Sequence, residues 1–269
     1  MVTTLTPLPT REPAPTGSPS DTPGGGPAAI ALAGLHKAFD GNQVLRGVDL
    51  VVRPGEALTI IGGSGTGKSV LLRLIIGLMK PDAGQILLEG TDIVPLRETA
   101  LLKIRRRTGM VFQGSALFDS LSVGENVAFA LREHTNLSDA EIAARVHEAL
   151  GLVGLGAIEG MDPADLSGGM KKRVAVARAI ALPPSVLLYD EPTTGLDPTN
   201  VEKITDLILD LKTKLGVTSV VVTHDMPSAL KVSDRVAMLH QGRIAAVGTP
   251  DEIQRTHHSL IRDFMEGRL

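Results

Sequence analysis

The chain has 269 residues, with 27 lysines and arginines against 30 aspartates and glutamates, and it contains no cysteine. Its net charge of −3 gives no basic excess that would indicate a nucleic-acid partner, and the missing cysteines exclude disulfides, thiol chemistry and cysteine-bound metals. No apolar run reaches the roughly 18 residues that cross a bilayer, and no secretory signal begins the chain. We therefore expect a soluble, cytoplasmic protein that only a partner would hold at a membrane.

The first part of the chain changes in character near residue 28. Residues 1–27 are rich in proline, threonine, serine and glycine, which predicts a disordered tail. Between residues 28 and 61, the apolar runs "AIALAGL", "VDLVV" and "ALTII" are separated by "FDGN" and "RPGE", a pattern typical of short strands joined by turns. There is no internal repeat, so residues 28–269 are predicted to form one domain.

The stretch "GGSGTGKS" lies between the strand-like "ALTII" and the helix-like "SVLLRLIIGLM". It matches the phosphate-binding pattern G-x-x-x-x-G-K-[ST], and these flanking elements favour that interpretation over a chance glycine-rich turn. Its glycines let backbone N–H groups wrap a β-phosphate, Lys68 offers a catalytic charge to the β- and γ-phosphates, and the Ser69 hydroxyl can bind Mg²⁺. The residues expected to contact the nucleotide here are Gly62, Gly63, Ser64, Gly65, Thr66, Gly67, Lys68, Ser69 and Val70.

An aromatic residue precedes this loop by one strand-like segment. Phe39, in "HKAFDGN", is one of only six aromatic residues in the chain, five Phe and one Tyr. Its ring is predicted to stack on the adenine of the nucleotide, and packing in the core is the alternative.

Two later apolar runs, "SVLLYD" (185–190) and "VTSVVVT" (217–223), are continuous rather than alternating, as in strands buried on both faces. Between them, apolar residues recur at helical spacing from Val201 to Leu215, and Gly216 follows as the expected C-terminal cap. A strand, a helix and a strand with short links predict a parallel sheet covered by helices.

Four polar residues follow or finish such runs: Gln113 after "GMVF", Asp190 and Glu191 in "LLYDE", and His224 after "VVVT". Asp190 can orient a water on Mg²⁺, with Gln113 as a further metal contact, and Glu191 can act as general base toward the attacking water. Gln113 and His224 can reach the γ-phosphate or that water. An exposed acidic turn and structural polar residues are the alternatives. The acidic pair favours hydrolysis over transfer to an acceptor.

Residues 114–165 are mainly helical in pattern, with "SDAEIAARVHEALGLV" the clearest segment and Ser138 its expected cap. They predict a helical subdomain inserted into the α/β core.

The next stretch, "LSGGMKKRVAVARAI" (166–180), begins a helix with a small polar residue and glycines, which is a good place to hold an anion. The alternative is an ordinary capped helix that packs closely through its glycines and has residues 171–173 on a solvated face.

In this order, "GGSGTGKS", Gln113, "LSGGM", "LLYDEP", "TGLD" (194–197) and His224 resemble the motifs of an ABC-transporter ATP-binding subunit. The resemblance covers the chain from about residue 30 to about residue 250. It implies an α/β fold: a P-loop NTPase core with a parallel sheet flanked by helices, an N-terminal antiparallel β layer and the inserted helical subdomain. It also implies that the protein hydrolyses ATP with Mg²⁺.

In that family two copies pack head to tail, and each ATP lies between the phosphate loop of one copy and the "LSGG" helix start of the other. Carried over, Ser167 and the N–H groups of Gly168 and Gly169 would donate to the γ-phosphate of the second copy's ATP, and Asp197 would lie at the seam. Departures from the family pattern are Met170, where many relatives have Gln, and the phenylalanine at the adenine position, where Tyr is commoner. Neither removes a catalytic group.

The segments "FQGSALFDSLSVGENVAFALREH" (112–134) and "LSGGMKKRVAVARAIAL" (166–182) are similar to those of Mla/Mce-type ATPases, which move phospholipids or other lipids. This resemblance implies that the protein works at the cytoplasmic face of the bacterial inner membrane. The partners that it implies are a transmembrane permease, an Mce-domain lipid-binding protein and a small STAS-domain protein. Leu117 and Phe118 are expected to line the permease groove, with burial in the helical subdomain as the alternative. Residues 256–269 form a C-terminal tail without an assigned partner.

Two other functions stay open. The first is an ABC ATPase for another substrate, which would use the same chemistry. The second is a non-transport ABC ATPase such as an assembly or translation factor. A single cassette is atypical of translation factors, and the chain has no long coiled-coil insertion of the DNA-repair kind.

Overall fold

The computed structural model describes residues 27–268, so the predicted disordered tail lies outside the described residues apart from Pro27. The described residues divide into two compact units: residues 27–101 with residues 218–268, and residues 102–217. Helix α2 (Glu98–Arg105) crosses the boundary between the units. Within the described part of the chain, no helix is both long enough and apolar enough to cross a membrane.

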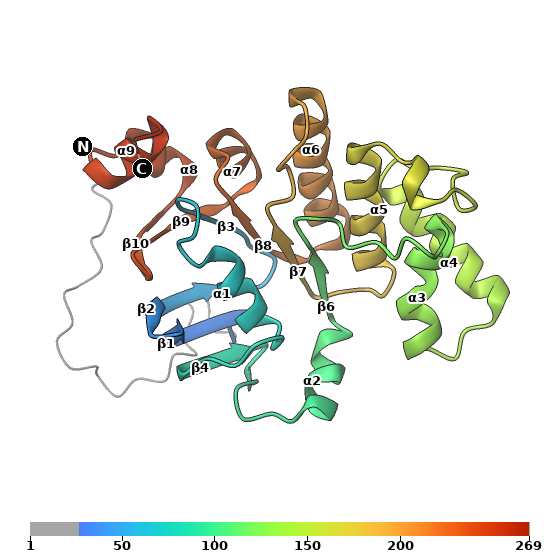
Figure 1. Ribbon diagram of the computed structural model, residues 1–269, viewed down its shortest axis with the longest axis horizontal. Coiled ribbons are helices and arrows are strands. Elements are labelled where there is room, and N and C mark those ends of the chain that lie inside the picture. The colour runs from blue at the N-terminus through green and yellow to red at the C-terminus, as the bar shows by residue number, and fades with distance from the viewer. Residues whose placement is uncertain (1–26, 269) are drawn as a thin grey trace. The chain divides into compact units, whose positions relative to one another are not determined.

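The first unit contains an antiparallel sheet in the order β2-β1-β4-β5 (Figure 1). Its strands are β1 (Ile30–Phe39), β2 (Asn42–Val52), β4 (Ala83–Leu88) and the short β5 (Thr91–Asp92). Asp40 and Gly41 join β1 to β2 with φ values of 49° and 81°. Two consecutive positive φ values define the tight turn that suits the twist of a hairpin. The expected N-terminal antiparallel layer is confirmed.

The same unit contains parallel strands, and they lead to the phosphate loop. Strand β3 (Ala57–Ile61) lies between β8 (Thr218–Thr223) and β9 (Arg235–His240) and is parallel to both. Strand β10 (Arg243–Gly248) pairs antiparallel with β9. Every residue of β3 and β8 is buried, as the absence of alternation in their sequences predicts. Helices α1 (Lys68–Ile75) and α7 (Met226–Val232) follow β3 and β8.

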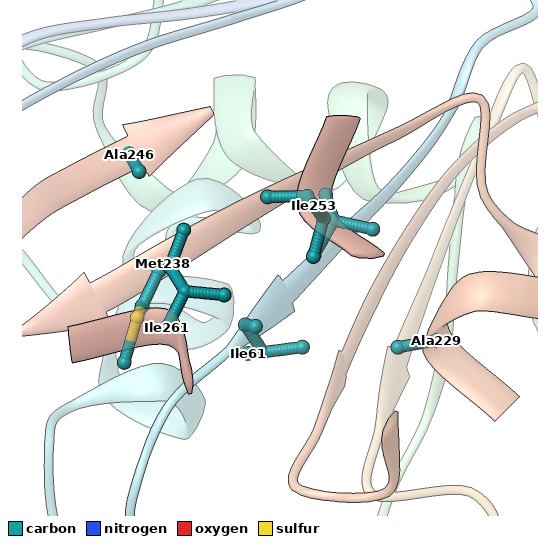
Figure 2. Close-up of a cluster of buried hydrophobic side chains, with 7 residues drawn as sticks. Ile61, Ala229, Met238, Ala246, Ile253 and Ile261 are labelled. Carbon is teal, nitrogen blue, oxygen red and sulfur yellow. The ribbon is translucent and has the colours of Figure 1, made fainter. Parts of the chain in front are cut away.

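A cluster of buried apolar side chains joins the C-terminal helices α8 (Pro250–Arg255) and α9 (Ser259–Met265) to the strand before the loop (Figure 2). Ile61 ends β3, Ile253 comes from α8 and Ile261 from α9, and each is fully buried. The remaining members are Ala229, Val236, Met238 and Ala246. The segment 256–269 therefore includes a helix that is anchored in this core.

The second unit holds strands β6 (Thr108–Val111) and β7 (Val186–Asp190), which run parallel. Its helices are α3 (Val123–His134), α4 (Asp139–Leu152), α5 (Gly168–Ile180) and α6 (Pro198–Leu215), with a short 3₁₀ helix at Pro163–Asp165. Helices α3, α4 and α5 pack on one another (Figure 1).

Two predicted helix ends are confirmed in this unit. Ser138 caps α4 in a capping box, in which its side chain accepts from Glu141 N–H while the Glu141 carboxylate accepts from Ser138 N–H. Gly216 ends α6 in the left-handed conformation, with φ 62°. Both ends depend on a few neighbouring residues, which is why the local sequence reveals them.

Candidate functional site

The phosphate loop begins directly after β3 and folds around the side chain of Lys68. The ammonium nitrogen of Lys68 donates to the carbonyl oxygens of Gly62, at 2.8 Å, and Gly63, at 3.0 Å. The hydroxyl of Thr66 also donates to Gly63, at 3.0 Å. The loop thus holds a buried positive charge beside backbone N–H groups at a helix start, which is an arrangement that binds phosphate.

Glycine is required at two positions of this loop, because of backbone conformation and because of close packing. Gly67 has φ 101°, a backbone conformation that residues with a Cβ rarely adopt, and it caps α1. A Cβ at Gly67 would lie 2.8 Å from Cγ1 of Val44, and one at Gly62 would lie 2.4 Å from the carbonyl oxygen of Leu239. The loop is therefore packed tightly between β2 and the end of β9.

The strand register brings His224 to the same edge as the loop. Ile61, the last residue of β3, pairs with Thr223 of β8. Because parallel strands end at one edge of a sheet, the residues that follow, Gly62 and His224, leave from adjacent positions. His224 is exposed, and Asp225 caps α7 by accepting from Ser228 N–H at 3.0 Å. His224 therefore follows the sheet at the edge where the phosphate loop starts.

Phe39 lies at the hairpin between β1 and β2, and 40% of its surface is exposed. This exposure rules out the alternative that its ring packs in the core. The ammonium of Lys37 lies 5.5 Å from the ring centroid. An exposed ring at a turn has a face that a planar base can cover.

In the second unit, the parallel pair β6 and β7 gathers the other predicted groups. Val111 pairs with Tyr189, so Gln113 and the pair Asp190 and Glu191 follow from the same edge. Asp190 and Glu191 are 3% and 7% exposed, which excludes the alternative of an exposed acidic turn.

Glu191 has a strained backbone, with φ 49° for a residue that is not glycine. Its carboxylate accepts from the hydroxyl of Thr194 at 3.1 Å, and its carbonyl accepts from Thr194 N–H at 3.3 Å. The ammonium of Lys172, from α5, also donates to the Glu191 carbonyl, at 3.4 Å. Strained residues that their neighbours hold in place are often functional.

Helix α5 begins at the "LSGG" segment with the geometry of an anion site. Ser167 is its N-cap, and its side chain accepts from Met170 N–H at 3.3 Å. Ser167 and Gly168 are exposed, whereas Gly169 is buried. A Cβ at Gly169 would lie 2.7 Å from the side-chain oxygen of Asn200, so a larger residue there would displace the Asn200 side chain.

Asn200 links this helix start to Asp197, the N-cap of α6. Asp197 accepts from Asn200 N–H at 3.1 Å and from the Asn200 side-chain amide at 2.5 Å. These hydrogen bonds hold the pKa of Asp197 below its ordinary value, so its carboxylate is charged at neutral pH. The predicted residues Gly169 and Asp197 thus meet through a third residue.

Comparison with known proteins decides what kind of site this is. A family model described as ABC transporter matches residues 45–194, which span the phosphate loop, the "LSGG" segment and the acidic pair. The chain belongs to the ABC transporter ATP-binding family. It therefore binds ATP and hydrolyses it, as the ATP-binding subunits of these transporters do.

Relatives of this ABC ATPase have several substrates. The probable ribonucleotide transport ATP-binding protein mkl of Mycobacterium leprae is 40% identical over 240 residues, which cover 89% of this chain and 69% of the relative. The intermembrane phospholipid transport ATP-binding protein MlaF of Escherichia coli K12 is 40% identical over 228 residues, covering 84% and 85%. The methionine import ATP-binding protein MetN of Caulobacter vibrioides is 47% identical over 216 residues, covering 80% and 65%.

A solved ABC cassette has the same fold as this ATPase. The dimeric post-hydrolysis structure of the cassette MJ0796 bound to ADP and Pi matches with a TM-score of 0.77 and 34% identity. The match covers 82% of this chain and 98% of that one. The α/β fold with its parallel sheet and antiparallel layer, inferred from the sequence, is confirmed.

Each of the two units of this ABC ATPase contains an oxygen donor of the kind that Mg²⁺ binds. Within residues 27–268, no three His, Asp or Glu side chains are arranged to hold a metal ion. Mg²⁺ commonly takes one or two protein ligands and completes its shell with phosphate oxygens and water. The Ser69 hydroxyl at the start of α1 and the buried Asp190 carboxylate at the end of β7 are oxygen donors of this kind.

Sequence reasoning missed Lys172 and Asn200. The alternative interpretation placed residues 171–173 on a solvated face, but Lys172 is only 6% exposed and donates to the carbonyl oxygens of Gln113 and Glu191. Helical spacing contained the signal, because Lys172 lies three residues after buried Gly169 and four before buried Val176. Asn200 carried no comparable signal.

Proposed function

We propose that this ABC ATPase forms a head-to-tail dimer whose ATP hydrolysis drives a membrane permease of a phospholipid transport system. The observation that carries the lipid assignment is the similarity to MlaF, at 40% identity over 85% of that protein. The segments 112–134 and 166–182 support the same assignment. The proposed location is the cytoplasmic face of a bacterial inner membrane, with an Mce-domain protein and a small STAS-domain protein as further partners.

In the proposed reaction, the first unit holds the triphosphate. The loop N–H groups and Lys68 bind the β- and γ-phosphates, the ring of Phe39 covers the adenine, and His224 reaches the γ-phosphate from the end of β8. All of these start from the β1–β2 turn or from the loop edge of β3 and β8. Their contribution is to position and neutralise the phosphates, which is the main demand of phosphoryl transfer.

The second unit supplies the groups for water attack. Glu191, buried and held by Thr194, accepts the proton of the attacking water, while Gln113 orients that water. Ser69, Asp190 and Gln113 would hold Mg²⁺. When bound, this ion neutralises charge that develops on the phosphates.

The second copy completes the site in this proposal. Ser167 and the N–H groups of Gly168 and Gly169 donate to the γ-phosphate bound by the partner copy, at the positive end of α5. Asp197, tied to Gly169 through Asn200, lies at the seam. Loss of the γ-phosphate removes these bonds, so hydrolysis opens the dimer. The dimeric structure of MJ0796 with ADP and Pi supports the participation of a second copy.

A pair of exposed aromatic rings supports the permease contact. Phe118 and Phe129 are each 43% exposed, and their ring centroids lie 4.9 Å apart. The buried side chain of Asn126 accepts from Phe118 N–H at 2.8 Å and donates to the Phe118 carbonyl at 3.0 Å, which fixes the loop. The alternative that Phe118 is buried is therefore wrong. Rigid exposed aromatic rings are typical of protein contacts.

Purification of the full complex from native membranes tests the proposal. We expect a permease and an Mce-domain protein to copurify, and phospholipid to be found by mass spectrometry. After reconstitution in phospholipid vesicles, ATP should drive lipid movement, and the Glu191→Gln variant should not. Copurification with a permease that carries an amino acid or sulfate, without lipid movement, would refute the lipid assignment.

The second candidate is import of a small polar substrate by the same chemistry. MetN is 47% identical, and the sulfate/thiosulfate import protein CysA of Caulobacter vibrioides is 44% identical over 227 residues. ATPase activity of the purified complex that rises with methionine or sulfate but not with phospholipid would favour it. An ATPase that copurifies with no permease would instead favour a non-transport role such as an assembly factor.

A further inference from the structure

Helix α5 carries a lysine in an unusual environment. The Lys172 side chain is 6% exposed, although lysine is rarely buried unless its charge has partners. Its ammonium donates to two main-chain carbonyl oxygens, those of Gln113 and Glu191. Since burial of an unpaired charge is costly, these contacts are the reason that this lysine can be buried.

Two carboxylates also favour the charged form of this lysine. Burial lowers the pKa of Lys172, and the nearby Asp190 and Glu191 oppose that shift. The ammonium therefore lies inside the unit, beside the acidic pair at the end of β7. A neutral side chain of the same length would lose both the attraction and the hydrogen bonds.

The two carbonyl groups belong to the segments that carry Gln113 and Glu191, whose positions matter most for the proposed reaction. Gln113 follows β6 and Glu191 follows β7, and these strands pair so that Val111 lies opposite Tyr189. Glu191 has a left-handed backbone, which an L-residue keeps only when its surroundings hold it. A donor that bonds to both carbonyls limits how far either segment can move alone.

We infer that Lys172 is a positioning residue, which joins the main chain at Gln113 to the main chain at Glu191 so that both side chains face the reacting phosphate together. This inference rests on the proposed function, in which Glu191 is the base and Gln113 orients the water. Lys172 itself does not contact the nucleotide in this scheme. It acts through the two segments that it connects.

Three variants test this role. Lys172→Met keeps an unbranched apolar stem but removes the charge and the donors, and Lys172→Arg keeps the charge and the donors. Lys171→Met is the matched control on the adjacent, half-buried lysine. A small displacement of catalytic groups typically lowers the rate by about 10²-fold. We expect Lys172→Met to lower kcat by about this factor with KM for ATP unchanged, and we expect Lys172→Arg to recover most of it. Lys171→Met should behave as the unaltered protein.

Hydrogen exchange gives a readout that does not depend on hydrolysis. In Lys172→Met, amide exchange should rise at residues 112–116 and 191–194, and in Lys172→Arg it should stay at the level of the unaltered protein. Unchanged exchange in Lys172→Met would overturn the link itself. Faster exchange with an unchanged kcat, or equal loss of kcat in the Met and Arg variants, would overturn the positioning role. Absence of ATPase activity in the unaltered protein would instead refute the proposed function.

Discussion

At the scale of single residues, the candidate site depends on backbone conformations with positive φ, which glycine adopts readily and other residues rarely do. Gly67 at φ 101° and Glu191 at φ 49° are two such positions. The first forms the turn at the start of α1, and the second holds a buried carboxylate just after the end of β7. Both are held by neighbours, namely Val44 at Gly67 and Thr194 at Glu191.

Glu191→Gln tests the proposed base. The amide has nearly the same shape but cannot accept the proton of the attacking water, so kcat should fall by about 10²–10⁴-fold. ATP should still bind and hold the dimer together. Steady-state ATPase assays and analytical ultracentrifugation with ATP measure the two effects. Normal turnover by this variant would show that another group is the base.

Lys68→Ala tests the charge in the phosphate loop. Without the ammonium, the loop loses its neutralising partner for the phosphates, so affinity for ATP should fall. Equilibrium binding of a fluorescent ATP analogue measures this change, with Lys80→Ala, on an exposed lysine of the first unit, as the control. Equal affinity in the Lys68 variant and the unaltered protein would contradict the assigned role.

At the scale of elements, the C-terminal helices support the strand from which the loop begins. Ile253 of α8 and Ile261 of α9 are fully buried in the same cluster as Ile61, the residue before Gly62. These helices are short, and most of their stability comes from this burial rather than from their own hydrogen bonds.

Ile253→Ala tests that support. Removal of a buried isoleucine side chain typically costs about 2–5 kcal/mol of unfolding free energy, because a cavity remains. Urea unfolding followed by circular dichroism measures the loss. Met265→Ala in α9, where 39% of the side chain is exposed, is the control and should change stability by about 0.5 kcal/mol or less. A similar small change for Ile253→Ala would mean that the cluster does not stabilise the fold.

At the scale of the whole molecule, the proposal requires two copies, since the loop and the "LSGG" helix start serve different nucleotides. The chain has no cysteine, so introduced cysteines are the only thiols present. Ser64 in the loop and Ser167 at the start of α5 are both exposed. They can therefore report whether these two places meet between copies.

Crosslinking of two singly substituted chains tests this arrangement. We expect Ser64→Cys and Ser167→Cys, mixed in the Glu191→Gln background, to form a crosslinked pair in ATP and much less in ADP. Leu137→Cys, on an exposed turn between α3 and α4, replaces Ser167→Cys in the control and should give no such pair. A crosslink that forms only within one chain, when both cysteines are in the same molecule, would refute the head-to-tail dimer.

Features that depend on near neighbours were predictable from the chain alone. The phosphate loop, the continuous strands and the caps at Ser138 and Gly216 each depend on residues a few positions apart, and motif order identified the family. Tertiary structure decided the rest. Lys172 is buried because its partners at Gln113 and Glu191, 59 and 19 residues away, lie around it. Likewise, Asn200 meets Gly169, and Ile261 meets Ile61, only after distant segments pack. Helical spacing can indicate that a residue such as Lys172 lies on the buried face of its helix, but the fold alone decides which distant groups it contacts.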